Sequence, residues 1–304
     1  FSQGFPLRFT NSQASVPPES EWNFEDEGWY KCYGNRTNSY EFDFSQISEL
    51  CSLGVGEHAP SFLLWGDSHA RSLASAVNAS ALEAGKTGYL VSMTGCSALL
   101  GIKVNDVKQC YQHNNLVISY LEAHPEIETI ILISRLSLYA TGDLYTIGTS
   151  KFWALEAMGV DANVGNANAD LFELGLQRTV DKLTKMKREV IIVLGVPEVK
   201  YAVLPALHIA LRTGRDLNEI IGPTLEEYKE RNAHVIPVIE YLERNSKNVK
   251  VLDPRILLCD DEKCKLAENN IPLYADNSHL TTFGAYYISS LFDPVFETRA
   301  RKEK

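Results

Sequence analysis

Five short, continuous apolar runs, separated by longer amphipathic stretches, constrain the fold of this chain more than any other feature. A strand with one face in water alternates apolar and polar residues, whereas an unbroken apolar run of strand length indicates burial on both faces. Such strands occur in parallel sheets with helices on both sides. The runs occupy residues 62–65, 88–93, 128–133, 190–196 and 249–252, and the predicted helices occupy residues 70–84, 111–123, 167–187, 225–244 and 279–292. We therefore predict an α/β fold with a parallel five-stranded sheet, at whose carboxyl edge the chemistry is expected.

The first 57 residues differ from the rest of the chain, because they are rich in Ser, Asn, Glu and aromatic residues and have few periodic apolar runs. We predict residues 1–57 as an N-terminal extension and residues 58–304 as one domain. Because the chain starts with Phe1, we expect it to be a piece of a longer or processed protein. Residues 137–165 and 200–223 interrupt the alternation, as lids and binding loops often do. No apolar run is long enough to span a bilayer.

The chain is acidic, with a formal net charge of −10. An acidic surface argues against nucleic acid or an anionic membrane surface as the partner, because both carry negative charge. A neutral substrate such as a sugar is compatible with it. Trp153 lies in one of the long connections and is the tryptophan that we expect to contact a sugar.

The cysteines form three local pairs, and six cysteines can pair in several ways. Proximity favours disulfides that join Cys32 to Cys51, Cys96 to Cys110, and Cys259 to Cys264. These pairs indicate an oxidising compartment, and six reduced, buried thiols are the alternative. No Cys-x-x-Cys pair occurs, so a structural zinc site is not expected.

The motif Gly-Asp-Ser-His at residues 66–69 lies where the first predicted strand turns into a helix. A serine at this point lies at the carboxyl edge of the sheet, where backbone N–H groups can stabilise an oxyanion. Alternatively, Asp67 or Ser68 only caps the helix. Asp67 and His69 also have the spacing of a metal-binding pair, but no further ligand cluster lies nearby, so we expect no metal.

A second motif, Asp-x-x-His, places Asp276 and His279 just before the last predicted helix. A serine hydroxyl becomes a good nucleophile only when a base takes its proton, and an imidazole base needs an acidic partner to hold its tautomer. The two motifs together supply all three groups. The alternative is that Asp276 caps the helix and that His279 is a surface residue.

The two motifs resemble the first and last conserved blocks of the SGNH hydrolases, which have a flavodoxin-like, three-layer α/β/α sandwich fold. The longer forms, Gly-Asp-Ser-His-Ala from residue 66 and Asp-x-Ser-His-Leu-Thr from residue 276, are similar to one subgroup. It is the SGNH domain of acyltransferase-3 fusion proteins, which O-acetylate bacterial polysaccharides such as the O-antigen of lipopolysaccharide. Thr-Gly-Cys-Ser-Ala-Leu at residues 94–99 also matches this subgroup. The resemblance covers about residues 60–292.

The resemblance implies a role for each matching residue. Ser68 corresponds to the nucleophile, His279 to the general base and Asp276 to the acid that orients the base. Gly95 corresponds to the second-block glycine, whose N–H forms the oxyanion hole together with the N–H of Ser68. Residues 133–139 depart from the family, because they contain no asparagine where the third block supplies one. We expect Arg135 or a backbone group to replace it, and a structural ion pair is the alternative for Arg135.

The function that the resemblance implies is the transfer of an acetyl group to an O-antigen sugar through an acyl-enzyme on Ser68. The expected location is the periplasm, with residues 1–57 linking the domain to an acyltransferase-3 domain in the inner membrane, which is absent from this chain and supplies the acyl group. No cofactor or metal is expected. One alternative is an acetylesterase that uses the same triad. A second alternative is a non-catalytic module that binds polysaccharide or docks on a membrane partner.

Overall fold

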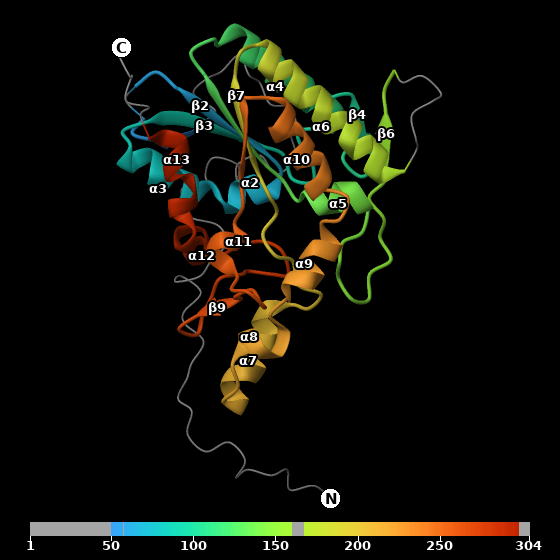
Figure 1. Cartoon of the computed structure of the whole chain (residues 1–304), viewed down its shortest axis with the longest axis vertical. Helices are drawn as coiled ribbons and strands as arrows, with labels where there is room; N and C mark the ends of the chain where they lie inside the picture. The colour runs from blue at the N-terminus through green and yellow to red at the C-terminus, as the bar shows by residue number, and fades with distance from the viewer. Residues whose placement is uncertain (1–49, 57, 160–166, 298–304) are drawn as a thin grey trace, which may run out of the picture.

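The computed structural model describes residues 50–56, 58–159 and 167–297, and its centre is a six-stranded sheet (Figure 1). The strand order is β1-β3-β2-β5-β7-β8, and every neighbouring pair except β1 and β3 is parallel. The five parallel strands are those that the apolar runs predicted. The strands are β1 (Cys51–Gly54), β2 (Phe62–Gly66), β3 (Thr87–Ser92), β5 (Thr129–Ile133), β7 (Glu189–Val193) and β8 (Val249–Leu252).

The sixth strand, β1, was not predicted, and it forms the antiparallel edge of the sheet. Leu53 of this strand is fully buried and pairs with Gly88 of β3. The strand lies within residues 1–57, which the sequence led us to predict as an extension. The folded domain therefore includes the last part of that stretch.

Helices cover both faces of the sheet, which confirms the three-layer α/β/α sandwich. Leu63 and Trp65 of β2 point into one apolar cluster with α4, α6 and α10, whereas Phe62 and Leu64 point into a second cluster with α2, α3, α12 and α13. Figure 1 shows α4, α6 and α10 on one side of the sheet and α3, α12 and α13 on the other. The helices are α2 (Ser68–Ser72), α3 (Ala74–Glu83), α4 (Cys110–Ala123), α6 (Asn168–Lys185), α10 (Ile236–Asn245), α12 (Thr282–Tyr287) and α13 (Asp293–Phe296).

Three of the predicted helices are divided. Residues 70–84 form α2 and α3, which meet at Leu73, and residues 225–244 form α9 (Leu225–Arg231) and α10. A capping box between Thr224 and Glu227 begins α9. The last predicted helix is α12 followed by the 3₁₀ helix η3 (Ser289–Phe292).

The two long connections contain regular structure that the sequence did not predict. The first holds α5 (Leu136–Thr141) and β6 (Leu155–Ala157), which pairs with β4 (Ile102–Val104). The second holds α7 (Val203–Thr213) and α8 (Leu217–Ile221). In Figure 1, α7 and α8 lie below the sheet with β9 (Ala267–Glu268), which pairs with β10 (Ile271–Pro272), and close to α11 (Arg255–Leu258).

No helix in the described ranges is both long and apolar enough to cross a membrane. Disulfides join Cys96 to Cys110 and Cys259 to Cys264, which are two of the pairs that proximity favoured. The third predicted pair cannot be compared, because Cys32 lies outside the described residues.

Burial of His113 on α4 makes the stability of the fold depend on pH. His113 is only 2% exposed, and burial lowers its pKa to about 4. The unfolded chain, with an ordinary histidine pKa of about 6.5, then binds the proton more tightly than the folded chain. The contribution of His113 to the free energy of unfolding is therefore most favourable above pH 6.5, and about 3 kcal/mol of it is lost as the pH is lowered towards 4.

The comparison of His113→Gln with wild type by urea unfolding at pH 7 and pH 4 measures this contribution. We expect the variant to lose about 3 kcal/mol less than wild type between the two pH values. His234→Gln, which replaces an exposed histidine, is the matched control and should follow wild type. Equal pH dependence of His113→Gln and wild type would show that His113 does not cause the effect.

Candidate active site

Ser68 is the first residue of α2 and directly follows the turn that ends β2. A Cβ atom at Gly66 would lie 1.7 Å from the carbonyl oxygen of Ile133, so only glycine allows the two strand ends to approach this closely. Asp67 caps the helix, because its Oδ1 accepts the N–H of His69 at 2.8 Å. The capping role that was an alternative for Asp67 or Ser68 thus belongs to Asp67.

Asp67 also connects the turn that carries Ser68 to the segment that follows β5. Its Oδ2 accepts the N–H of Arg135 at 3.0 Å and the hydroxyl of Tyr139 at 2.9 Å. The side chain is fully enclosed, and burial raises the pKa of its carboxyl despite these hydrogen bonds. Asp67 therefore fixes the position of the turn that carries Ser68.

The side chains of Ser68, His279 and Asp276 form one hydrogen-bonded chain. Ser68 Oγ lies 2.8 Å from His279 Nε2, although the two residues are 211 positions apart in the sequence. His279 Nδ1 lies 2.7 Å from Asp276 Oδ2. The structure thus brings together the three residues that the sequence predicted as a triad.

The Asp276 carboxylate is held by the turn that it begins. Its Oδ1 accepts the backbone N–H groups of Ser278 at 2.7 Å and His279 at 2.8 Å. Burial raises the pKa of this carboxyl, but the hydrogen bonds from His279 and Ser278 outweigh burial and hold the pKa below its usual value. An ionised carboxylate beside Nδ1 favours the tautomer whose Nε2 can accept the proton of Ser68.

His69 packs against the imidazole ring of His279. Its ring centroid lies 4.4 Å from that of His279, and burial, together with the neighbouring charges of His279 and Arg135, lowers its pKa well below the ordinary value. Its Nε2 has no hydrogen-bond partner in the described part of the chain. His69 is thus a neutral ring against which His279 packs.

Gly95 lies in the loop after β3, at the same edge of the sheet as Ser68. The N–H of Met93 donates to the carbonyl of Gly66 at 3.1 Å, and Arg71 of α2 donates to Thr94 Oγ1 at 2.6 Å. Gly95 has a positive φ of +72°, and a Cβ there would lie 2.7 Å from the Trp153 ring. The Ser68 and Gly95 N–H groups donate to no other described group, as an oxyanion hole requires.

The contact between Gly95 and Trp153 gives a testable prediction. Gly95→Ala forces the loop away from Trp153, and we expect a roughly 100-fold lower kcat for acetyl ester cleavage, the cost of losing one oxyanion donor. Gly85→Ala is the matched control, because Gly85 also has a positive φ but no atom within 4 Å of its added Cβ. Equal kcat values for the two variants would show that Gly95 has no part in the oxyanion hole.

The side chain of Arg135 forms the ion pair that was the alternative for this residue. Its Nη2 donates to Glu198 Oε2 at 2.8 Å and to the carbonyl of Leu144 at 2.7 Å. Coulombic attraction to Glu198 outweighs the effect of burial and raises the pKa of Arg135. The guanidinium group of Arg135 thus forms a buried ion pair with Glu198, and its part in the oxyanion hole stays a prediction.

Sequence reasoning did not find Tyr139, Glu198 or Arg231 as residues of this region. Glu198 joins Arg135 to Arg231, whose Nε lies 3.2 Å from Glu198 Oε2. No motif surrounds these residues, and each lies several residues away from the nearest strand end of the sheet, so no sequence signal was available for them. In the part of the chain that the structure describes, no three His, Cys, Asp or Glu side chains are grouped as a metal ion would require.

An α/β/α sandwich with a serine after its first parallel strand and an Asp-x-x-His turn near its end defines an SGNH hydrolase-type domain. Residues 31–294 match the family described as "SGNH domain (fused to AT3 domains)", and the chain belongs to this family.

Among solved structures, the chain is similar to the lipopolysaccharide acetyltransferase periplasmic domain of Salmonella ser. Paratyphi A. The TM-score is 0.52 at 15% identity, and the match covers 78% of this chain and 83% of that one. This likeness supports the fold. The comparison with curated proteins gave no match.

Proposed function

We propose that this chain is the periplasmic domain of an O-acetyltransferase, which moves an acetyl group onto a polysaccharide sugar through an acyl-enzyme on Ser68. The observation that carries the proposal is the hydrogen-bonded chain from Ser68 through His279 to Asp276. The family supports it, because its members are fused to AT3 domains. The similar Salmonella domain belongs to a lipopolysaccharide acetyltransferase, which favours an O-antigen sugar as acceptor.

In the first half of the proposed reaction, His279 Nε2 takes the hydroxyl proton of Ser68 while Ser68 Oγ attacks the acetyl carbonyl carbon. The carbonyl oxygen becomes an oxyanion, and the N–H groups of Ser68 and Gly95 stabilise it. When the bond to the leaving group breaks, protonated His279 returns the proton to that group. Asp276 stabilises the imidazolium while it holds the proton.

In the second half, a sugar hydroxyl replaces the leaving group. His279 removes the proton of this hydroxyl, the sugar oxygen attacks the acetyl carbonyl, and Ser68 leaves with the proton from His279. The membrane-embedded acyltransferase-3 domain is the proposed acetyl supplier. The steps on this chain use only its own side chains and backbone groups, so the proposal includes no cofactor or metal.

A single assay tests the proposal against both alternatives. The chain is incubated with p-nitrophenyl acetate and deacetylated O-antigen polysaccharide, and free acetate and acetylated sugar are measured together by mass spectrometry. The proposal predicts acetylated sugar that requires Ser68. Free acetate alone would identify an acetylesterase. Binding of polysaccharide with neither product would identify a binding module.

A further inference from the structure

Glu198 is a buried carboxylate close to the proposed active site that the proposed reaction does not use. It lies in the loop after β7 and is 7% exposed. Its Oε1 accepts the hydroxyl of Ser137 at 2.5 Å, and its Oε2 accepts from Arg135 Nη2 at 2.8 Å and Arg231 Nε at 3.2 Å. Both of its oxygens are therefore occupied by partners from two other elements.

Glu198 remains charged in spite of its burial. Burial raises the pKa of a carboxyl group, but the guanidinium groups of Arg135 and Arg231 outweigh burial and hold the pKa of Glu198 below its ordinary value. Without this carboxylate, two guanidinium groups that are nearly inaccessible to water would face each other unpaired. Glu198 is thus the carboxylate that both arginines share as their ion-pair partner.

Glu198 is linked through Arg135 to the turn that carries Ser68. The N–H of Arg135 donates to Asp67 Oδ2 at 3.0 Å, and Asp67 caps the helix that begins with Ser68. The side chain of the same arginine is fixed by Glu198. A displacement of Arg135 would therefore be transmitted to the turn that carries the Ser68 hydroxyl.

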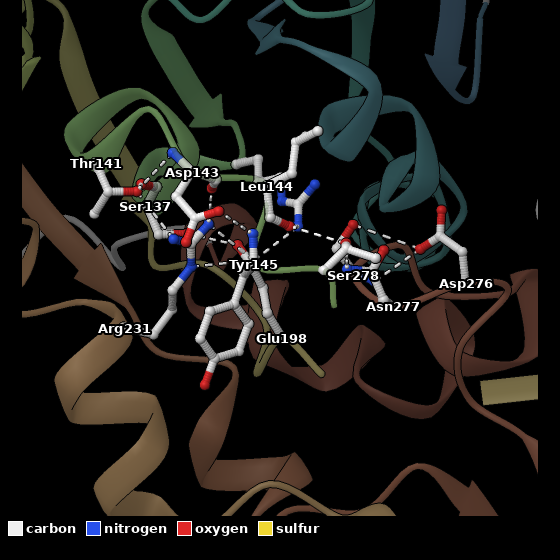
Figure 2. A network of polar contacts seen from close by, with 12 residues as sticks. Ser137, Thr141, Asp143, Leu144, Tyr145, Glu198, Arg231, Asp276, Asn277 and Ser278 are labelled. Atoms are coloured by element: carbon white, nitrogen blue, oxygen red, sulfur yellow. Dashed lines mark hydrogen bonds and ion pairs between the residues drawn. The ribbon is translucent and has the colours of Figure 1, made fainter. Parts of the chain in front are cut away.

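The loop that carries Glu198 is also linked to the turn that carries His279. The N–H of Val199, the residue after Glu198, donates to the carbonyl oxygen of Asn277 at 2.9 Å. The Asn277 side chain donates to Thr146 Oγ1 at 2.9 Å. Figure 2 shows Glu198 and Arg231 in one polar network with the turn formed by Asp276, Asn277 and Ser278. The loop of Glu198 is therefore hydrogen-bonded directly to the turn between Asp276 and His279, and it is linked to the Ser68 turn through Arg135 and Asp67.

We propose that Glu198 is a positioning residue, which fixes the Ser68 turn and the Asp276–His279 turn relative to each other. The two turns come from opposite ends of the chain, and their hydrogen bond spans 2.8 Å from Ser68 Oγ to His279 Nε2. A displacement of about 1 Å between reacting groups can lower a rate by roughly 100-fold. This inference rests on the proposed function, because it assigns Glu198 a role in the same triad.

Labelling by a fluorophosphonate, which reacts with an activated serine, tests the inference. For Glu198→Gln we expect the maximal labelling rate constant, kinact, to fall roughly 100-fold, because the Ser68 and His279 side chains lose their alignment. The half-saturating probe concentration, KI, should change little, because Glu198 does not touch the probe. Labelling and thermal unfolding are measured on the same samples, at a temperature where each variant is folded.

Two further variants keep the outcome decisive. Val190→Ala removes buried methyl groups at the opposite end of β7, so it should lower Tm and leave kinact unchanged. Ser137→Ala removes one hydrogen bond to Glu198 but no charge, and it decides the matter if Glu198→Gln does not fold. Ser137→Ala should also lower kinact while KI changes little. Wild-type kinact in folded Glu198→Gln, or in Ser137→Ala if that variant alone folds, overturns the inference.

The same labelling experiment also tests the proposed function separately. Wild type should be labelled at Ser68, and Ser68→Ala should not be labelled. Absence of labelling in wild type overturns the proposed function and this inference with it. Labelled wild type with an equally reactive Glu198→Gln overturns the inference alone.

Discussion

Replacing Ser68 with alanine is expected to lower the turnover of acetyl esters by roughly 10⁴- to 10⁶-fold, to the level that binding and the oxyanion hole alone can give. Ser68 Oγ is the atom that His279 Nε2 approaches to 2.8 Å, and alanine has no atom that can form the acyl-enzyme. The measurement is the initial rate of p-nitrophenol release from p-nitrophenyl acetate. Transfer of acetyl groups to the polysaccharide should fall in parallel.

Ser119→Ala is the matched control, because Ser119 is exposed on α4 on one face of the sandwich. It should keep the wild-type rate. If Ser68→Ala retains full acetyl transfer to the polysaccharide while it remains folded, then a non-catalytic binding module becomes the better account of this chain.

Asp276→Asn is expected to lower kcat by roughly 10⁴-fold without unfolding the chain, because the imidazole then loses the partner that selects its tautomer. Asp276 Oδ2 lies 2.7 Å from His279 Nδ1, and an asparagine amide can instead donate to that nitrogen. The proton would then reside on Nε2, which could no longer accept the proton of Ser68. Steady-state kinetics and circular dichroism on the same preparation separate the loss of activity from a loss of fold.

Asp181→Asn is the corresponding control. It makes the same chemical change at an exposed residue of α6, far from His279 in the fold. Its kcat should equal that of wild type. A kcat for Asp276→Asn within about tenfold of wild type would mean that Asp276 does not orient His279 in the reaction.

The sheet could be predicted from the sequence because its five parallel strands are buried on both faces, and such strands are unbroken apolar runs. The edge strand β1 lacked this signal. It has four residues, and Ser52 and Gly54 alternate with the buried Cys51 and Leu53. A stretch this short becomes a strand only through its pairing with β3.

The helix α7 was not predicted, because residues 200–223 were interpreted as a long connection that interrupts the alternation of strands and helices, and Pro205 lies near the start of this helix. Pro205 is tolerated there because it lies in the first turn, where its missing N–H has no partner within the helix. The buried residues of α7 contact the elements around β10, and this tertiary packing is not visible in the sequence.

The proposed triad could be predicted because each of its residues lies in a local motif at an end of the chain. Glu198 could not be predicted, because its role depends on two arginines that lie 63 and 33 positions away in the sequence. The ion pair of Arg135 could not be predicted for the same reason, and the sequence left two interpretations of Arg135 open, an oxyanion contact and a structural ion pair. Charged side chains that meet only in the folded chain have no spacing that a sequence pattern can show.

The central claim, that His279 activates Ser68 to carry the acetyl group, is tested most directly by rapid quenching with an acetyl donor. The peptide that contains Ser68 is then examined by mass spectrometry. We predict that a single acetyl group accumulates on Ser68 in the wild-type chain and is absent in His279→Ala. Acetyl transfer by the wild-type chain without modification of Ser68, or equal acetylation of Ser68 in His279→Ala, would contradict the account.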